Sequence, residues 1–140
     1  MHDKDVVVVR KGEALPYSKP DDLLPIVMTI PRGYYFWGVT ENIKQNKQEA
    51  VLTSSELQSL KLVASKRADA TIVSEITLAH YTKTLFSPSV FEALAEPQDT
   101  YTRHFLFPKN RKADFEAIAP VIEQLGKNTE WQEILSNHAL

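Results

Sequence analysis

The sequence predicts an α/β domain in which helices flank a mostly parallel, five-stranded sheet, followed by two C-terminal helices. Residues 6–9 form a continuous β-branched run, which is typical of a strand buried on both faces of a parallel sheet. Short apolar runs then alternate with segments of helical periodicity, and this alternation favours parallel strands with covered faces. Residues 111–140 have helical spacing, which indicates helices without further strands.

Composition narrows the classes of function. The chain has 140 residues, of which 43% are apolar and 24% are charged, an ordinary mixture for one globular domain. Its net charge of −2 argues against a nucleic-acid-binding protein, which usually carries a basic excess. The chain has no cysteine, so disulfides, cysteine-bound zinc and thiol catalysis are excluded. No apolar run approaches the ~20 residues of a membrane-spanning helix, and the first residues have no signal-peptide pattern.

Strands are expected where β-branched and apolar residues cluster between turn residues. The expected strands are residues 6–9, 24–30, 51–52, 70–73 and 103–107. Pro25 begins the second strand, where proline is tolerated, and Pro108 ends the last one.

Helices are expected where capping residues precede apolar residues at helical spacing. The expected helices are residues 40–49, 57–66 and 74–82, a turn or two between Pro88 and Pro97, residues 115–125 and residues 129–138. Thr53 and Glu56 form a capping-box pattern, and Ser74 and Thr129 are expected N-caps. Pro120 is expected to kink or restart its helix, and Gly126 stands where a C-terminal glycine belongs.

No set of residues points to catalysis. None of the four histidines has a partner at metal-ligand spacing, so no metal site is expected. Phosphate-binding glycine loops and nucleophile motifs are absent, and Glu92 and Glu96 are interpreted as a solvated helix face. We therefore expect no catalytic residue, no cofactor and no enzyme activity.

An unusual aromatic segment follows the second expected strand. Residues 34–37 are four consecutive aromatic residues, preceded by Gly33. Ligands of α/β sheets bind at the carboxyl ends of the strands. Arg32, Gly33, Tyr34 and Tyr35 are therefore candidate ligand-binding residues, with the rings as a stacking wall. The alternative is that the rings only pack over the edge of the sheet.

A second candidate lies at the end of the strand at residues 70–73. If this strand is parallel to the second one, Ser74 and Glu75 share an edge with the aromatic segment. Glu75 is a candidate acceptor for a cationic group of a ligand, with Ser74 beside it. The alternative is that Ser74 is an N-cap and Glu75 an acid of the first helical turn, and the two roles are compatible.

Several segments follow one another in an order that is typical of one protein family. They are residues 5–12, 17–24, 26–35, 57–73, 104–110 and 115–135. In this order they resemble the bacterial periplasmic solute-binding proteins of the polar amino-acid type, extracellular solute-binding family three. Residues 5–12 resemble the strand that crosses into the second lobe of these proteins, and Lys66 stands at the position of a usual glycine. The resemblance rests on the order of these segments rather than on any single one.

The resemblance implies the fold of a periplasmic-binding-protein-like (type II) lobe. Residues 1–110 would be the second lobe with both hinge-crossing strands, and residues 111–140 would be helices that pack on the first lobe. Most of the first lobe has no counterpart here, so we expect the uncovered apolar faces to drive self-association, with exchange of the C-terminal helices between copies as one route. The residues expected at this contact are Phe115, Ile118, Ile122, Trp131 and Leu135.

The resemblance also implies a function, the periplasmic solute-binding component of an ABC-type importer. Such a protein delivers a small polar solute, such as an amino acid, to a membrane permease. The family's second-lobe ligand contacts carry over to Arg32, Gly33, Tyr34, Tyr35, Ser74 and Glu75. Tyr34 replaces a usual small hydroxyl residue, and Glu75 replaces a usual Asp, and both departures bear on the identity of the ligand. The alternatives are a ligand-sensing domain of a membrane signalling protein, a lobe fused to an enzyme, and an interaction protein that has lost its ligand.

Overall fold

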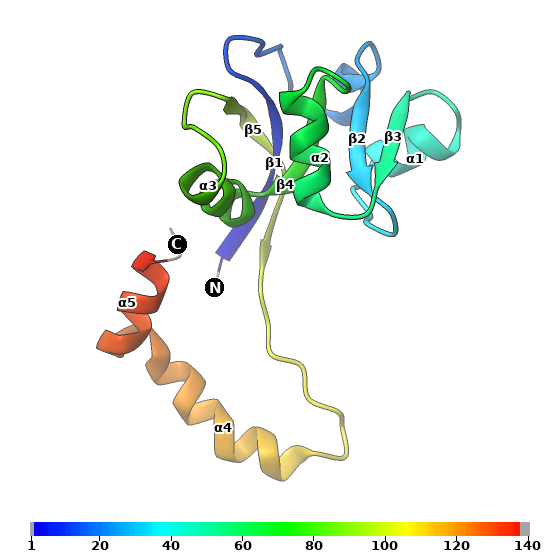
Figure 1. Ribbon diagram of the computed structural model, residues 1–140. Coiled ribbons are helices and arrows are strands. Elements are labelled where there is room, and N and C mark those ends of the chain that lie inside the picture. Colours follow the sequence, from blue (N-terminus) through cyan, green and yellow to red (C-terminus); the bar gives the residue numbers. More distant parts are fainter. Residues whose placement is uncertain (1, 138–140) are drawn as a thin grey trace. The chain divides into compact units, whose positions relative to one another are not determined.

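The computed structural model describes residues 2–137 (Figure 1). These residues form two compact units, residues 2–101 and residues 102–137. The division predicted from the resemblance, at residue 110, concerns lobes of a larger protein and stays a prediction. Each unit is described by itself.

The larger unit is a five-stranded sheet with helices on both faces, which confirms the predicted fold class. The strands are β1 (His2–Arg10), β2 (Met28–Pro31), β3 (Ala50–Thr53), β4 (Ala70–Ser74) and β5 (Phe91–Thr102), arranged in the order β3-β2-β4-β1-β5. The helices are η1 (Pro20–Leu23), α1 (Val39–Lys44), α2 (Glu56–Ala64) and α3 (Glu75–Thr84).

The sheet is parallel only in part. β2 runs parallel to both β3 and β4, whereas β1 runs antiparallel to β4 with Val7 opposite Ile72. Residues 6–9 of β1 are buried on both faces, as their continuous apolar pattern predicts. That pattern reports burial by helices on both faces and does not encode strand direction.

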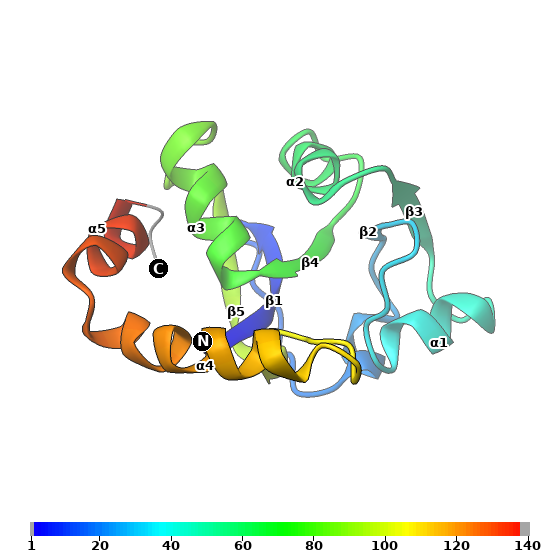
Figure 2. The same cartoon turned by 90° about the horizontal axis from the view of Figure 1, so that it is seen from below.

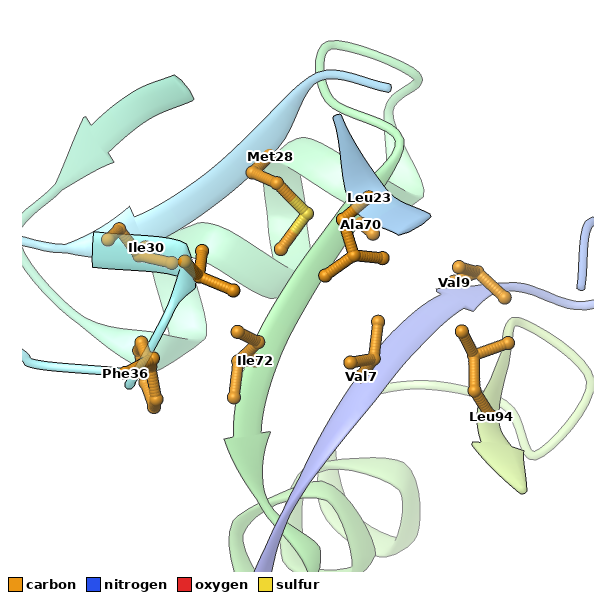
Figure 3. Packing of buried hydrophobic residues seen from close by; sticks show 10 residues of the cluster. Val7, Val9, Leu23, Met28, Ile30, Phe36, Ala70, Ile72 and Leu94 are labelled. Atoms are coloured by element: carbon orange, nitrogen blue, oxygen red, sulfur yellow. The ribbon is translucent and has the colours of Figure 1, made fainter. Parts of the chain in front are cut away.

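Side chains of the sheet alternate between two apolar cores. Helices α2 and α3 cover one face, and η1 and α1 cover the other (Figure 2). Figure 3 shows the core under η1 and α1, a cluster that includes Val7, Met28, Ile72 and the buried ring of Phe36. The second core joins Val6, Val8 and Val73 of the strands to apolar residues of α2 and α3.

Two predicted elements are wrong. The segment between Pro88 and Pro97 is largely strand β5 rather than helix, because it pairs at the free edge of β1. β5 is an edge strand, where a proline such as Pro97 removes no hydrogen bond from a ladder on its outer side. Residues 103–107 are not a strand, and Glu92 and Glu96 lie on β5 rather than on a helix face.

Helix caps fall close to the predicted positions. α2 begins at Glu56, where the Ser55 hydroxyl accepts a hydrogen bond from the Gln58 amide at 3.2 Å. Thr53 is not the cap, because its hydroxyl is buried and pairs with Ser59 at 2.7 Å. Ser74 caps α3, as predicted.

The smaller unit contains α4 (Lys112–Gln124), η2 (Leu125–Lys127) and α5 (Thr129–Asn137). Pro120 lies within α4 without ending it, and Gly126 belongs to η2. Asn128, rather than Thr129, caps α5, because its side-chain oxygen accepts from the Trp131 amide at 2.9 Å. His138, which was expected to extend this helix, lies outside the described residues.

Candidate functional site

The two candidate segments leave the sheet at one edge. β2 and β4 are adjacent and parallel, with Met28 opposite Ala70 and Thr29 opposite Thr71. In this register, the turn after Pro31 and the start of α3 after Ser74 both follow the carboxyl ends of their strands (Figure 1). This is the edge of an α/β sheet at which ligands usually bind.

A tight turn positions the first candidate segment. The Tyr34 amide donates to the Pro31 carbonyl (N···O 3.3 Å), and the Arg32 amide donates to the Thr53 carbonyl of β3 (3.0 Å). Gly33 occupies the third position of this turn with a φ of +83°, which side-chain-bearing residues rarely adopt. A Cβ atom at Gly33 would meet nothing within 4 Å, so the backbone angle, rather than close approach, requires glycine here.

The aromatic segment is divided between core and solvent. Phe36 is buried, whereas Tyr34, Tyr35 and Trp37 are 48%, 60% and 70% exposed. The rings of Tyr34 and Phe36 are tilted against each other with centroids 6.2 Å apart. Packing over the sheet therefore accounts for one ring of the four, and three rings stay available at this edge.

Two of the exposed rings, Tyr34 and Tyr35, border a groove of about 540 Å³, and Trp37 does not. Four of the candidate residues, Arg32, Gly33, Tyr34 and Tyr35, line it together. The other lining residues are Ile30, Pro31, Thr40, Ile43, Lys44 and Leu52. The residues from α1 and β3 were missed in the sequence. No local signal in the sequence marks them, because the parallel pairing of β3 with β2 is known only from the structure.

Hydrogen bonds to Glu41 hold the aromatic segment against α1. The Tyr35 hydroxyl donates to one carboxylate oxygen, and the Gly38 amide donates to the other at 2.6 Å. The hydrogen bond from Tyr35 is the main cause that lowers the pKa of Glu41, and the same bond raises the pKa of Tyr35. Gly38 itself is required, because a Cβ atom there would lie 2.4 Å from the ring of Pro20.

Ser74 and Glu75 do not line this groove. The Ser74 hydroxyl accepts from the Thr77 amide at 3.1 Å and pairs with the Thr77 hydroxyl at 2.9 Å, so it is used in capping α3. The Glu75 carboxylate forms a salt bridge with Lys4 of β1 at 2.9 Å. Glu75 borders a separate hollow of about 450 Å³ between α3 and β5. The structure thus brings four of the six candidate residues together and leaves two beside them.

The described residues contain no cluster of three or more His, Asp or Glu side chains arranged to hold a metal ion. Within residues 2–137, no helix combines the length and apolar character needed to cross a membrane.

Comparison with known proteins gives the fold. No family model and no curated protein matches the chain. Among solved structures, the chain resembles a mutant of ArgBP from T. maritima with a TM-score of 0.75 and 18% identity, covering 98% of this chain and 58% of that one. It also resembles the GluR0 ligand-binding core from Nostoc punctiforme in complex with L-glutamate, with a TM-score of 0.74 and 17% identity, covering 97% of this chain and 60% of that one.

The chain has the fold of these ligand-binding proteins. A third such structure, the L-cystine solute receptor of Neisseria gonorrhoeae in its unliganded open conformation, aligns with a TM-score of 0.60 and 19% identity over 90% of this chain and 52% of that one. The chain therefore spans less than two thirds of the length of each of these proteins. The descriptions of the second and third of these structures name a ligand-binding core and a solute receptor.

Proposed function

We propose that this chain is one lobe of a solute-binding receptor that captures a small polar solute, such as an amino acid, for an ABC-type importer. The observation that carries the proposal is the parallel pairing of β2 and β4, which places the Arg32 turn and the start of α3 at one edge. The likeness to proteins described as binding arginine, L-glutamate and L-cystine supports an amino acid as the solute. A periplasmic location and a membrane permease as partner belong to the same proposal.

In this proposal the edge forms half of an interlobe cleft. Arg32, Gly33, Tyr34 and Tyr35 contact the solute directly, since they border one groove. Glu75 binds an amino group of the solute, which replaces Lys4 as the partner of its carboxylate. This replacement is easy because the salt bridge with Lys4 is exposed, and exposed ion pairs are weak. Ser74 supports Glu75 by capping the helix on which it lies. Half a cleft provides only part of the contacts, so the chain alone should bind its solute weakly.

A nuclear magnetic resonance titration of ¹⁵N-labelled chain with amino acids, polyamines and small dicarboxylates tests the proposal. A ligand should shift the amide signals of residues 32–35 in a saturable manner. Tyr34→Ala should weaken this ligand, whereas Trp37→Ala should not. Trp37 is the matched control, because it is an exposed ring of the same segment that does not border the groove.

The result that contradicts the proposal is equally concrete. If every ligand that binds shifts signals away from this edge, or if the Tyr34 and Trp37 variants bind alike, the edge is not the solute site. Glu75→Gln should weaken a ligand that carries an amino group, and Glu49→Gln, an exposed acid that ends the loop before β3, should have no effect.

A ligand-sensing domain of a membrane signalling protein is the second candidate. The likeness to a structure described as the GluR0 ligand-binding core favours it, because that description names a binding part of a protein rather than a free carrier. The titration above does not separate the two candidates. Copurification with an importer permease from membranes would favour the importer receptor, whereas its absence together with a fused signalling module would favour the sensor.

We further propose that copies of this chain associate through the apolar faces of the C-terminal helices. The Phe115 side chain is 49% exposed and that of Ile118 is 43% exposed. The other three residues of this surface, Ile122, Trp131 and Leu135, are half-buried. Burial of such side chains between copies would stabilise a dimer through the hydrophobic effect. Light scattering should show a concentration-dependent dimer that Phe115→Glu converts to a monomer, with Glu116→Gln as the control. A monomer at high concentration would contradict this proposal.

A further inference from the structure

The groove beside β2 has an apolar and aromatic lining. Ile30 of β2 and Leu52 of β3 are opposite each other in the sheet and form its floor with Ile43 of α1. Tyr34, 48% exposed, borders it as a wall. A lining of this kind removes water from an apolar or planar group rather than from a fully hydrated solute.

The charges at the groove are positive. Arg32 and Lys44 both border it, and neither forms a salt bridge with another described residue. No Asp or Glu is among the described lining residues. Two cations that face the same groove attract an anion more strongly than either does alone.

Nearby carboxylates are already engaged. Glu41 accepts from the Tyr35 hydroxyl and the Gly38 amide, and the attraction of Lys44 is the smallest of the causes that lower the pKa of Glu41. Glu75 pairs with Lys4 at 2.9 Å. The cations of the groove are therefore not neutralised by the acids of the same edge, and a cationic solute would meet like charge there.

From this combination we propose that the groove binds an organic carboxylate with a planar apolar group, of the size of an arylacetic acid. The carboxylate lies between Arg32 and Lys44, and the planar group lies against Tyr34 and Leu52. The proposal rests on the proposed solute-binding function and narrows it, because it excludes a guanidinium or ammonium group from this groove.

Three probes separate the contributions of charge and ring. Phenylacetate carries both groups, acetate carries only the anion, and phenethylamine carries the ring with the opposite charge. In a nuclear magnetic resonance titration of the 140-residue chain, phenylacetate should shift the amides of residues 32–35 and of Leu52. Its affinity should exceed that of each other probe by about tenfold and should fall as salt is added.

Charge-removing variants test the assignment of the two cations. Arg32→Gln and Lys44→Gln should each weaken phenylacetate by about three- to fivefold, as expected for one exposed ion pair. Lys47→Gln and Arg67→Gln remove exposed cations that do not border the groove, and both variants should bind phenylacetate unchanged.

The outcomes distinguish this inference from the proposed function. If phenethylamine binds as well as phenylacetate, or if the four variants behave alike, the anionic groove is refuted. If amino acids shift the edge while phenylacetate does not, only the ligand class proposed here fails. If phenylacetate shifts the groove but no amino acid does, the amino-acid assignment fails and the anionic groove stands. If no probe and no amino acid binds, both proposals fail.

Discussion

Replacement of Asp69 by alanine should destabilise the sheet unit substantially. One carboxylate oxygen of Asp69 accepts from the Val27 amide at 2.8 Å, just before β2 begins. The other faces the guanidinium of Arg10 at 3.4 Å, and that guanidinium also donates to the carbonyls of Val63 and Ala68 at 2.9 and 2.6 Å. Asp69 thus connects the segment before β2 to the end of β1 and to the loop after α2.

The magnitude follows from the two contacts that the substitution removes. A hydrogen bond to a charged acceptor contributes about 1.5–3 kcal/mol, and no other acceptor among the described residues pairs with the Val27 amide. The pair with Arg10 adds less than about 1 kcal/mol, because the Asp69 side chain is 44% exposed and Arg10 keeps Glu13 as a partner. We expect a loss of about 2–3 kcal/mol in the free energy of unfolding for Asp69→Ala. At about 1.4 kcal/mol per tenfold change, the folded-to-unfolded ratio falls roughly 30- to 150-fold.

Urea unfolding followed by circular dichroism measures this loss, with amide exchange at Val7 and Ile72 as local probes of the sheet. Asp69→Asn keeps an acceptor for the Val27 amide without the charge, so it should lose less than half as much stability. Glu49→Ala removes an exposed acid of the same unit and should change the free energy of unfolding by less than about 0.5 kcal/mol. The reasoning is refuted if Asp69→Ala is no more destabilising than Glu49→Ala, or if the Asn variant is as destabilising as the Ala variant.

Two further predictions concern single side chains. Ser55→Ala should lower the free energy of unfolding by about 1 kcal/mol, because the Gln58 amide at the start of α2 loses its cap, and Ser55→Asp should retain most of the stability; chemical denaturation checks both. Burial, with a smaller contribution from Asp22, raises the pKa of Tyr17 from 10.0 to about 12. The folded state then holds this proton more tightly than the unfolded state, so the contribution of Tyr17 to stability is complete below pH 10 and is lost between pH 10 and pH 12. Ultraviolet titration of tyrosinate in the wild type and in Tyr17→Phe measures this pKa, because the difference between the two curves is the titration of Tyr17. A difference curve with the ordinary pKa of tyrosine would contradict the prediction.

Much of the fold follows from local patterns. Local residue patterns predict the strand at residues 6–9, the short strands β3 and β4, and the cap at Ser74. No local pattern of this kind predicts β5. Phe91 and Leu94 are spaced as on a helix, and Pro97 argues against a strand, yet the unpaired edge of β1 makes the extended form more favourable.

The opposite error arises at residues 103–107. These residues have strand-forming side chains, and Phe105 and Leu106 are 66% and 90% exposed. A strand needs a neighbouring backbone to satisfy its amides and carbonyls, and the described sheet ends at β5. Propensity without an available edge therefore produces no strand here.

The candidate site shows the same division. Arg32, Gly33, Tyr34 and Tyr35 are recognisable in the sequence, since a glycine turn and exposed rings at the end of a buried strand are local features. Leu52 joins them because β3 pairs with β2, and Lys44 joins them because α1 ends at the same groove; no local pattern encodes either arrangement.

The amino-acid pattern alone predicted the buried strand at residues 6–9, the starts of most helices and the end of the second strand near Gly33, because these depend on each residue and its near neighbours. Strand direction at β1, the pairing of β5 and the partnership of Glu75 with Lys4 were decided by the folded chain. They depend on which strand edges pair and which charged side chains come together in the folded chain. The free energy of these contacts comes from pairs of residues that are distant in sequence.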